Sequence, residues 1–156
     1  MFDSSVFRRL SLSLLFALCC VVACSGCNRG PKMAKVSGKV FYKDGTVPKG
    51  GVCVVNFTPT RDSTAEVRKG ATGTIGPDGS FSLSTRAPDD GVYVGEYAVT
   101  FVVWPGPMDP RSLVLPKYAS PMMTPYKEKV EADKSDLKYE IEPAPGGPIA
   151  PAAAAQ

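Results

Sequence analysis

The chain has 156 residues, with 18 basic and 15 acidic side chains, a net charge of +3 and no histidine. This length suits one domain, and so small a positive surplus gives no sign of the clustered basic face by which nucleic-acid binding is recognised. Histidine is the commonest metal ligand and the commonest general base near neutral pH, so its absence argues against zinc hydrolysis and against Ser–His or Cys–His catalysis. We therefore expect no nucleic-acid partner, no metal and no cofactor.

Residues 1–23 follow the order of parts in a bacterial secretory signal. The basic pair Arg8–Arg9 precedes an apolar run, Leu10–Ala23. As a helix, this run of about 14 residues is ~21 Å long, which is shorter than the ~30 Å hydrocarbon core of a bilayer. The pattern therefore favours a signal peptide with a helical apolar region over a membrane span. An uncleaved N-terminal anchor is the alternative.

Two cysteines at the end of this leader are candidates for lipid attachment. Val21–Val22–Ala23–Cys24 is similar to the lipobox of bacterial lipoproteins and fits it at every position, whereas the sequence before Cys27 has a poor first residue. A Cys-x-x-Cys pair can also bind metal or act in redox chemistry, but here it lacks a second ligand pair and a strand–helix context. We predict lipidation of Cys24, of the palmitate-carrying lipoprotein type, with Cys27 as the alternative.

Lipidation would place the protein at the cell membrane or the outer membrane, with its domain facing the periplasm or the exterior. Residues 24–35 are the expected tether, and residues 36–142 the expected domain. Only Cys53 of the five cysteines lies in that domain, so an internal disulfide framework is excluded. The membrane, reached through the lipid, is the first expected partner; an envelope protein or a glycan is the second.

Alternation of apolar and polar residues predicts strands in the first half of the domain. Val36–Gly45 alternates and ends in the turn signal Asp44–Gly45. Gly51–Pro59 is a second strand, with Cys53, Val55 and Phe57 on one face and Val52, Val54 and Asn56 on the other. Within the second strand, Cys53 shares a face with Val55 and is expected in the core as a small hydrophobic residue. A reactive thiol is the rival interpretation, but the sequence shows no basic neighbourhood for it.

Three further strand regions follow. Ala71–Thr85 predicts a hairpin around the turn Gly76–Pro77–Asp78–Gly79. A calcium loop at this turn would need more acidic ligands at alternating positions. Val92–Trp104 is the most apolar strand, with both faces apolar near its end, and is expected at the centre of a sheet. Asp136–Glu142 alternates cleanly and is expected to close the fold with one face in solvent.

A proline-rich segment, residues 105–125, separates these last two strands. Its six prolines exclude a regular helix or a central strand, and loops of this length are often functional. Trp104, Tyr118 and Tyr126 lie in or beside it and are the candidate binding residues. Packing of the segment onto the domain is the alternative role for these aromatic residues. The Pro/Ala-rich tail, residues 143–156, is expected to be disordered.

Short strands with Gly, Pro and Asp turns predict an all-β fold, a small antiparallel Greek-key β-sandwich of about seven strands. The ordered set VSGKVFYKDGTVPKGGVCVVNFTP, GTIGPDGSFSLST, GVYVGEYAVTFV and LPKYASPMMTPYKEKVEADKSDLKYEIE resembles the carboxypeptidase regulatory-like domains. In this order it also looks like short lipoproteins of planctomycete-type bacteria. The resemblance implies a transthyretin-like (prealbumin-type) sandwich.

The enzymes related to these domains do not fit this sequence. Hydroxyisourate hydrolases share the transthyretin fold but work through histidines, which this chain lacks. Zinc carboxypeptidases hold their metal in a separate catalytic domain. The carboxylates Asp89, Asp90 and Glu96 do not suggest a glycosidase cleft. We expect a non-catalytic, lipid-anchored cell-envelope protein whose β-sandwich serves structure or interaction. The alternative is a glycan- or peptide-binding module that uses the aromatic residues of the proline-rich segment.

Overall fold

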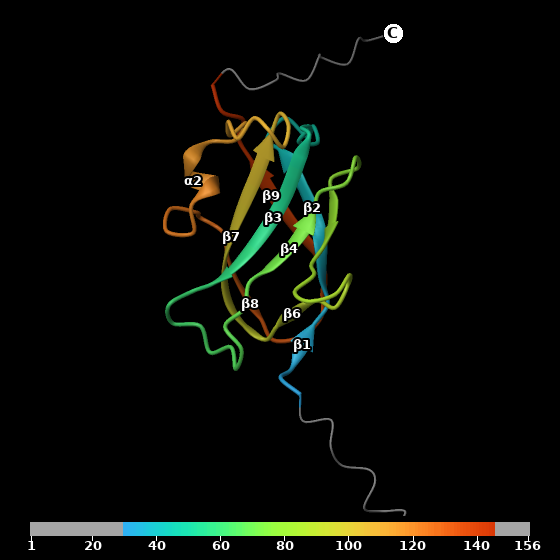
Figure 1. The fold of residues 1–156 in the computed structure, drawn as a ribbon, viewed down its shortest axis with the longest axis vertical. Coiled ribbons are helices and arrows are strands. Elements are labelled where there is room, and N and C mark those ends of the chain that lie inside the picture. Colours follow the sequence, from blue (N-terminus) through green and yellow to red (C-terminus); the bar gives the residue numbers. More distant parts are fainter. Residues whose placement is uncertain (1–29, 146–156) are drawn as a thin grey trace, which may run out of the picture. The chain divides into compact units, whose positions relative to one another are not determined.

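The computed structural model describes residues 30–145, which form a β-sandwich (Figure 1). The expected signal helix, with Cys24 and Cys27, lies outside the described residues, so lipidation stays a prediction. Most of the expected tail, residues 146–156, also lies outside them. Within residues 30–145, no helix has the length and apolar character needed to cross a membrane.

The described residues contain nine strands and one helix of four residues. They are β1 (Met33–Ala34), β2 (Val36–Tyr42), β3 (Val52–Pro59), β4 (Ala71–Thr74), β5 (Ser80–Ser82), β6 (Val92–Tyr93), β7 (Gly95–Trp104), α2 (Pro116–Ala119), β8 (Lys127–Val130) and β9 (Lys134–Ile141). Since β1 and β6 have two residues each, seven strands (9 − 2) are longer. This agrees with the expected all-β sandwich of about seven strands.

Two sheets make up the sandwich. The three-stranded sheet has the order β5-β2-β9, the four-stranded sheet has the order β4-β3-β7-β8, and β1 pairs with β6 beside them. The long strand β7 lies inside its sheet between β3 and β8, as the apolar character of both its faces predicted. The expected strand Val92–Trp104 is divided at Val94, whose N–H donates to the carbonyl of Lys32 at 3.0 Å and extends the β1–β6 pairing, whereas β7 pairs with β3 and β8.

One pairing departs from the antiparallel pattern. All the strand pairs are antiparallel except β2 and β9, which run parallel. The chain leaves β8 in the four-stranded sheet and enters β9 in the three-stranded sheet within residues 131–133. Because β9 arrives from the opposite sheet, no tight turn joins it to β2, and it is free to pair in the parallel direction.

The expected hairpin over Ala71–Thr85 is present at its turn, but its two strands pair mainly with other strands. The turn is present, since the N–H of Gly79 donates to the carbonyl of Gly76 at 2.9 Å and Gly79 has a φ of +81°, which favours glycine. However, β4 pairs with β3 and β5 pairs with β2, so the two strands lie in different sheets. The two arms are joined beside the turn, where the N–H of Gly76 donates to the carbonyl of Ser80 at 2.7 Å, and at Thr72 and Ser84, which exchange backbone hydrogen bonds of 2.9 and 2.8 Å. A local alternation pattern does not distinguish a hairpin from a chain that crosses between sheets.

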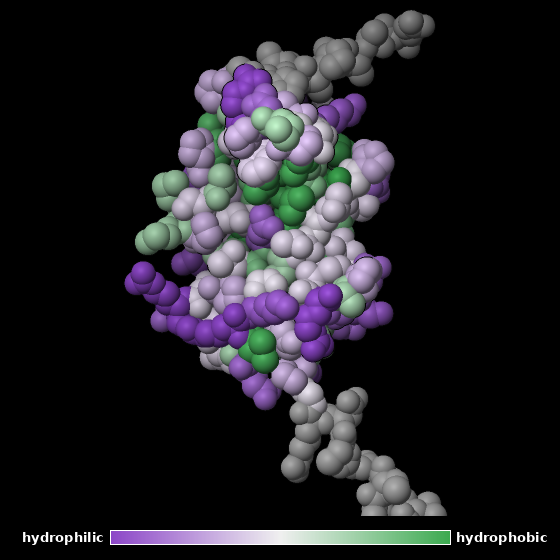
Figure 2. Space-filling view, in the orientation of Figure 1, coloured by the Kyte–Doolittle hydropathy of each residue, from purple (hydrophilic) through white to green (hydrophobic). Residues whose placement is uncertain are grey.

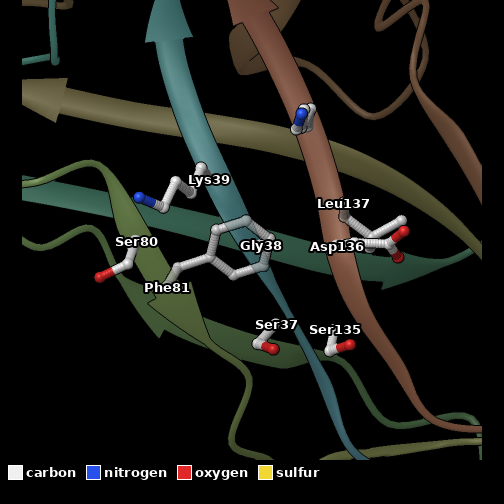
Figure 3. Close-up of a pocket in the computed structure, with 9 residues that line it drawn as sticks. Ser37, Gly38, Lys39, Ser80, Phe81, Ser135, Asp136 and Leu137 are labelled. Atoms are coloured by element: carbon white, nitrogen blue, oxygen red, sulfur yellow. The ribbon is translucent and has the colours of Figure 1, made fainter.

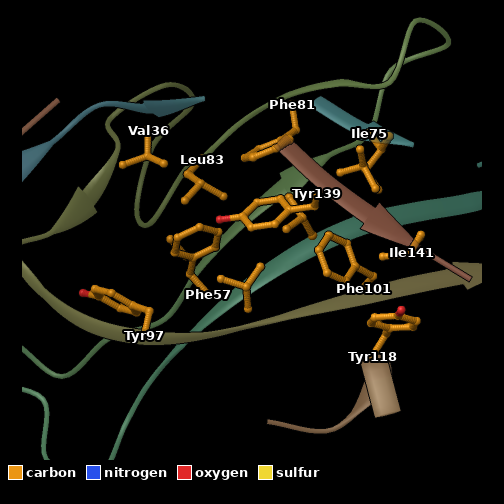
Figure 4. Packing of buried hydrophobic residues seen from close by; sticks show 14 of the residues in the cluster. Val36, Phe57, Ile75, Phe81, Leu83, Tyr97, Phe101, Tyr118, Tyr139 and Ile141 are labelled. Atoms are coloured by element: carbon orange, nitrogen blue, oxygen red, sulfur yellow. The ribbon is translucent and has the colours of Figure 1, made fainter. Parts of the chain in front are cut away.

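Aromatic side chains from both sheets fill the core (Figure 4). Phe101 from β7 contacts Tyr139 from β9 edge-on, with ring centroids 5.4 Å apart. Phe57 lies against Tyr97 at 5.9 Å, and Phe81 stacks with Tyr139 at 6.1 Å. Each fully buried large apolar side chain contributes roughly 1.5–3 kcal/mol, so this cluster holds the two sheets together.

Cys53 is half-buried and packs against the edge of this core, which agrees with its expected role as a small hydrophobic residue. Its Sγ atom lies 3.8 Å from the carbonyl oxygens of both Pro48 and Gly50. Burial raises the pKa of the Cys53 thiol. A raised pKa disfavours the thiolate, so the structure offers no support for a reactive cysteine.

Candidate functional site

The aromatic binding candidates mostly belong to the core. Tyr118, on α2, is only 3% exposed and meets the ring of Phe101 edge-on at 6.5 Å. Tyr126 is half-buried, stacks on Tyr118 at 6.0 Å, and donates its hydroxyl to the carbonyl of Glu140. These two tyrosines therefore pack the proline-rich segment onto the sandwich and offer no open aromatic platform. Trp104 is half-buried at the end of β7.

Glu142, the residue directly after β9, links the proline-rich segment to the end of that strand. One oxygen, Oε1, accepts hydrogen bonds from Lys117 Nζ at 2.8 Å and from the Tyr118 hydroxyl at 3.0 Å, and Lys43 Nζ lies 3.0 Å away. The hydrogen bonds from Lys117, Lys43 and Tyr118 lower the pKa of Glu142 to about 2. The N–H of Ala144 also donates to the carbonyl of Leu113 at 2.8 Å, so the start of the expected tail is held by the segment.

Methionines are the large hydrophobic residues that this segment exposes. Met108 is 95% exposed, Met122 is 88% exposed and Met123 is 57% exposed. These side chains contribute little to packing. Exposed methionines adapt to varied apolar partners.

The outer face of the four-stranded sheet carries a half-exposed apolar strip. It consists of Val52, Val54, Val102 and Trp104, all of intermediate burial. The register places Val52 opposite Trp104 and Val54 opposite Val102 across β3 and β7. Figure 2 shows strongly hydrophobic residues gathered in a hollow on the face that β3, β4 and β7 form in Figure 1. We call these four residues the apolar strip.

The outer face of the three-stranded sheet is polar and hollowed at one point (Figure 3). The hollow has a volume of about 280 Å³ and spans β5, β2 and β9. Its lining residues are Ser37, Gly38, Lys39, Ser80, Phe81, Ser135, Asp136, Leu137 and Lys138. We call this hollow the polar trough.

The strand register explains the form of the polar trough. Phe81, Gly38 and Leu137 lie in one row across the three strands, with Gly38 in the middle. Phe81 is buried in the core, and Gly38 has no side chain, so little projects outward from this row. Successive residues of a strand point to opposite faces, so the chain neighbours of this row point outward. Lys39 and Ser80 border the row on one side and Ser37 borders it on the other.

A β-bulge in β9 shapes one wall of the trough. The register shifts between Val36 and Gly38, so that Ser135 and Asp136 of β9 lie opposite the single residue Ser37 of β2. A side chain at Gly38 would overlap the carbonyl oxygen of Leu137, and its Cβ would lie 2.8 Å from the Cβ of Leu137. The close approach of β9 therefore requires glycine at this position. Bulges commonly redirect side chains beside binding sites.

Two lysines of the trough stand side by side. Lys39 of β2 and Lys138 of β9 are register partners, and like charges on neighbouring strands repel. Lys39 lies 3.8 Å from Asp78, but both side chains are at least half exposed, so the pair is weak. Within residues 30–145, Lys138 makes no ion pair.

Two of the three acidic residues considered for catalysis, Asp90 and Glu96, anchor loops instead. Asp90 accepts hydrogen bonds from the backbone N–H groups of Thr85, Arg86 and Ala87 at 2.7–3.1 Å, which lower its pKa. Glu96 accepts from Thr64 N–H at 2.7 Å, and its pKa is lowered in the same way. In residues 30–145 no three His, Cys, Asp or Glu side chains are grouped so that they could hold a metal ion.

Together these features define a small β-sandwich whose two outer faces differ in chemistry, one with an apolar strip and the other with a polar trough. No protein-family model, curated protein or solved structure matches the chain.

Of the residues on these two surfaces, only Trp104 was predicted as a site residue. The apolar character of both faces of Val92–Trp104 near its end was visible in the sequence, but it was attributed to a central strand, and no role was assigned to the face of Gly51–Pro59 that carries Val52 and Val54. A half-exposed sheet face gives the same pattern, so Val54 and Val102 were missed. In VSGKV, Gly38 interrupts the row of valines, and this is the one signal of the polar trough. The strand register that brings Lys138 beside Lys39 cannot be read from the sequence.

Proposed function

We propose that the chain is a lipid-anchored, non-catalytic protein of the cell envelope that binds a partner protein through its β-sandwich. The observation that carries the interaction is the apolar strip. A soluble surface seldom leaves neighbouring large apolar side chains partly in solvent without a use, and here the pairs Val52–Trp104 and Val54–Val102 lie together on β3 and β7. Tryptophan is enriched among residues that dominate binding energy at interfaces.

Other observations support this function. Val21–Cys24 is similar to a lipobox, and the resemblance to carboxypeptidase regulatory-like domains implies a transthyretin-like module without a catalytic centre of its own. Asp90 and Glu96 anchor loops. The lipid would keep the domain at one membrane surface, where even a weak contact gains from the high local concentration of a membrane partner.

The anchor is tested by the intact mass of the mature protein from membranes. We expect the diacylglyceryl and acyl mass on Cys24, and its loss in a Cys24→Ser variant. The same mass on Cys27 would move the attachment site three residues along the chain, from position 24 to position 27. Absence of lipid from both cysteines would refute the anchor.

The interaction is tested with the lipid intact. Val102→Lys places a charge in the middle of the apolar strip, on a side chain that is already half exposed. We expect this variant to lose the partners that co-purify with the wild-type chain from detergent-solubilised membranes. Thr72→Lys, on the exposed face of β4 in the same sheet, is the control and should retain them. Equal recovery of partners by Val102→Lys would contradict the interaction.

A second function has one observation in its favour. Trp104 keeps part of its ring accessible, as a glycan- or peptide-binding module would require. Because its neighbour is Val52 and the next pair is Val54 and Val102, the surroundings suit an apolar peptide better than a glycan. The other two aromatic candidates, Tyr118 and Tyr126, pack against the core and against each other.

A further inference from the structure

The polar trough has the composition of a small-ligand site. Most of its surface is apolar, as suits the face of a sugar ring, and the residues around it carry hydroxyl groups on Ser37, Ser80 and Ser135, ammonium groups on Lys39 and Lys138, and one carboxylate on Asp136. Ser80 already donates its hydroxyl to Asp78 at 2.6 Å, so toward a ligand it offers its acceptor lone pairs. The other two serine hydroxyls make no hydrogen bond within residues 30–145 and are free to donate and to accept.

The size of the trough limits the ligand. A volume of about 280 Å³ lies near the lower end of the ~300–1,000 Å³ found for small-molecule pockets. Three adjacent strands span roughly 10 Å, since neighbouring strands are about 4.8 Å apart. One six-membered sugar ring fits this breadth, whereas a folded protein surface does not enter so small a hollow.

The arrangement of charge indicates which kind of sugar. Lys39 and Lys138 are neighbours in register, and a carboxylate placed between them would relieve their repulsion. On the opposite side of the Gly38 row, Ser37 and Asp136 suit the hydroxyl groups of a sugar, which donate to the carboxylate and exchange hydrogen bonds with serine. A simple anion would satisfy only the lysine side.

From this geometry we propose that the polar trough binds an acidic sugar, with the sugar carboxylate at Lys39 and Lys138 and its hydroxyls at Ser37, Ser135 and Asp136. The site is separate from the apolar strip, because the two lie on different sheets. It goes beyond the proposed function and does not depend on the lipid or on the partner protein. The bound sugar carboxylate has two sources, a uronic acid of a polysaccharide or the lactyl ether of a cell-wall amino sugar.

The test is a titration of the ¹⁵N-labelled full chain in mild detergent, observed through the amide signals of Ser37, Gly38 and Ser135. The probes are galacturonate, glucuronate and N-acetylmuramic acid, with galactose, glucose, acetate and inorganic phosphate as comparisons. We expect saturable shifts with at least one acidic sugar and a Kd of about 1 mM, as suits a shallow exposed site. The uronates and N-acetylmuramic acid distinguish the two sources.

Charge-removing variants locate the carboxylate. We expect Lys39→Gln and Lys138→Gln each to weaken binding about two- to fivefold, the range of an exposed ion pair. Lys127→Gln, on the exposed edge strand β8 of the other sheet, is the matched control and should bind as the wild type does. Both substituted lysines are exposed, so these variants should fold.

Three outcomes would overturn the proposal. The first is the absence of any shift with all three acidic sugars at about 50 mM, far above the expected Kd. The second is equal binding of galactose, which would show that the lysines play no part. The third is equal binding of phosphate or acetate, which would reduce the trough to an unselective anion site. None of these results would affect co-purification of a partner through the apolar strip.

Discussion

The two outer faces of the sandwich show how one fold gives two different surfaces. On the four-stranded sheet, Val54 and Val102 pair across β3 and β7, and apolar side chains continue to the surface. On the three-stranded sheet, Lys39 and Lys138 pair across β2 and β9, and the surface is charged and hollowed. Both sheets bury the same kind of inner face, so the difference lies only in the alternate residues that do not contribute to the core.

Inward-facing and outward-facing residues therefore affect different properties of the molecule. Inner residues such as Val55 and Ile141 are fully buried, and their substitution changes the free energy of unfolding. Outer residues change what the molecule can contact. One residue belongs to both groups: Gly38 lies in the floor of the polar trough and also permits the close approach of β9.

Gly38→Val is expected to have the largest effect. The new valine side chain would overlap the backbone of Leu137. Overpacking of this kind costs roughly 3 kcal/mol of unfolding free energy. For a domain of this size, such a loss lowers the melting temperature by roughly 10 °C or more. Thermal unfolding followed by circular dichroism measures the change. Ser37→Val, one residue earlier on the outer face of β2, is the control and should melt close to the wild type. Equal melting of Gly38→Val and wild type would show that β9 lies farther from β2.

Two buried tyrosines, one on each sheet, should respond in opposite directions to loss of the hydroxyl. Tyr97 donates its hydroxyl to the carbonyl of Tyr93 at 2.7 Å, so Tyr97→Phe should destabilise the fold by about 1 kcal/mol. Burial, and then the nearby charge of Glu128, raises the pKa of Tyr139, but its buried hydroxyl makes no hydrogen bond to any of residues 30–145. Tyr139→Phe should therefore stabilise the fold by about 1 kcal/mol.

Urea denaturation of the two variants measures both effects. Because each change removes only one oxygen from a buried ring, the variants serve as controls for each other. A loss of stability in Tyr139→Phe comparable to that in Tyr97→Phe would mean that the Tyr139 hydroxyl has a partner, with Glu128 the first candidate.

Acid should loosen the attachment of the proline-rich segment to β9. The pKa of Glu142 falls from its ordinary value of 4.5 to about 2 through hydrogen bonds from Lys117, Lys43 and Tyr118. A lowered folded-state pKa gives stability that is present above about pH 4.5 and is lost as the pH falls toward 2. The melting-temperature difference between wild type and Glu142→Gln should therefore shrink over this interval.

The control for acid is Glu140→Gln, a change of an exposed carboxylate on the same strand. Its melting temperature should follow that of the wild type through the whole titration. A melting-temperature difference between wild type and Glu142→Gln that stays constant from pH 6 to pH 2 would contradict the role given to Glu142.

The smallest effect is expected at the apolar strip itself. Val54→Thr changes an outward, half-buried side chain and should alter the free energy of unfolding by no more than about 0.5 kcal/mol. Val55→Thr, the next residue along β3, is fully buried and should cost about 1–3 kcal/mol, because a hydroxyl is buried without a partner. Denaturation curves of the two variants measure this contrast. Similar costs at the two positions would show that the strip is covered.

Period-two patterns predicted most strands, because alternation between core and solvent is a local property. Val36–Tyr42 and Lys134–Ile141 were found close to their expected ranges. Pairing between distant strands is not local, so the parallel contact of β2 with β9 and the separation of β4 from β5 were not expected. The structure extends the ordered part beyond the expected domain, since Met33–Ala34 pair with β6 and Ala144 bonds to the proline-rich segment.

The candidate sites were harder to predict for the same reason. Tyr118 and Tyr126 were judged by their place in a loop, but their burial depends on the aromatic rings of other strands, such as Phe101. Trp104 was predicted, but its partner Val52 follows from the antiparallel register of β3 and β7. Sequence alone identifies side chains with binding chemistry, and only the register shows which of them share a surface.

The most direct test of the interaction face is photo-crosslinking in intact cells, with the chain carrying its own leader and cysteines. A benzophenone side chain replaces Val54 in the apolar strip or, as the control, Ser82 on the exposed face of β5 in the other sheet. We predict a discrete protein adduct from position 54 that Val102→Lys abolishes, and no such adduct from position 82. Absence of an adduct at position 54, or equal adducts at both positions, would contradict the assignment of the apolar strip as the partner-binding face.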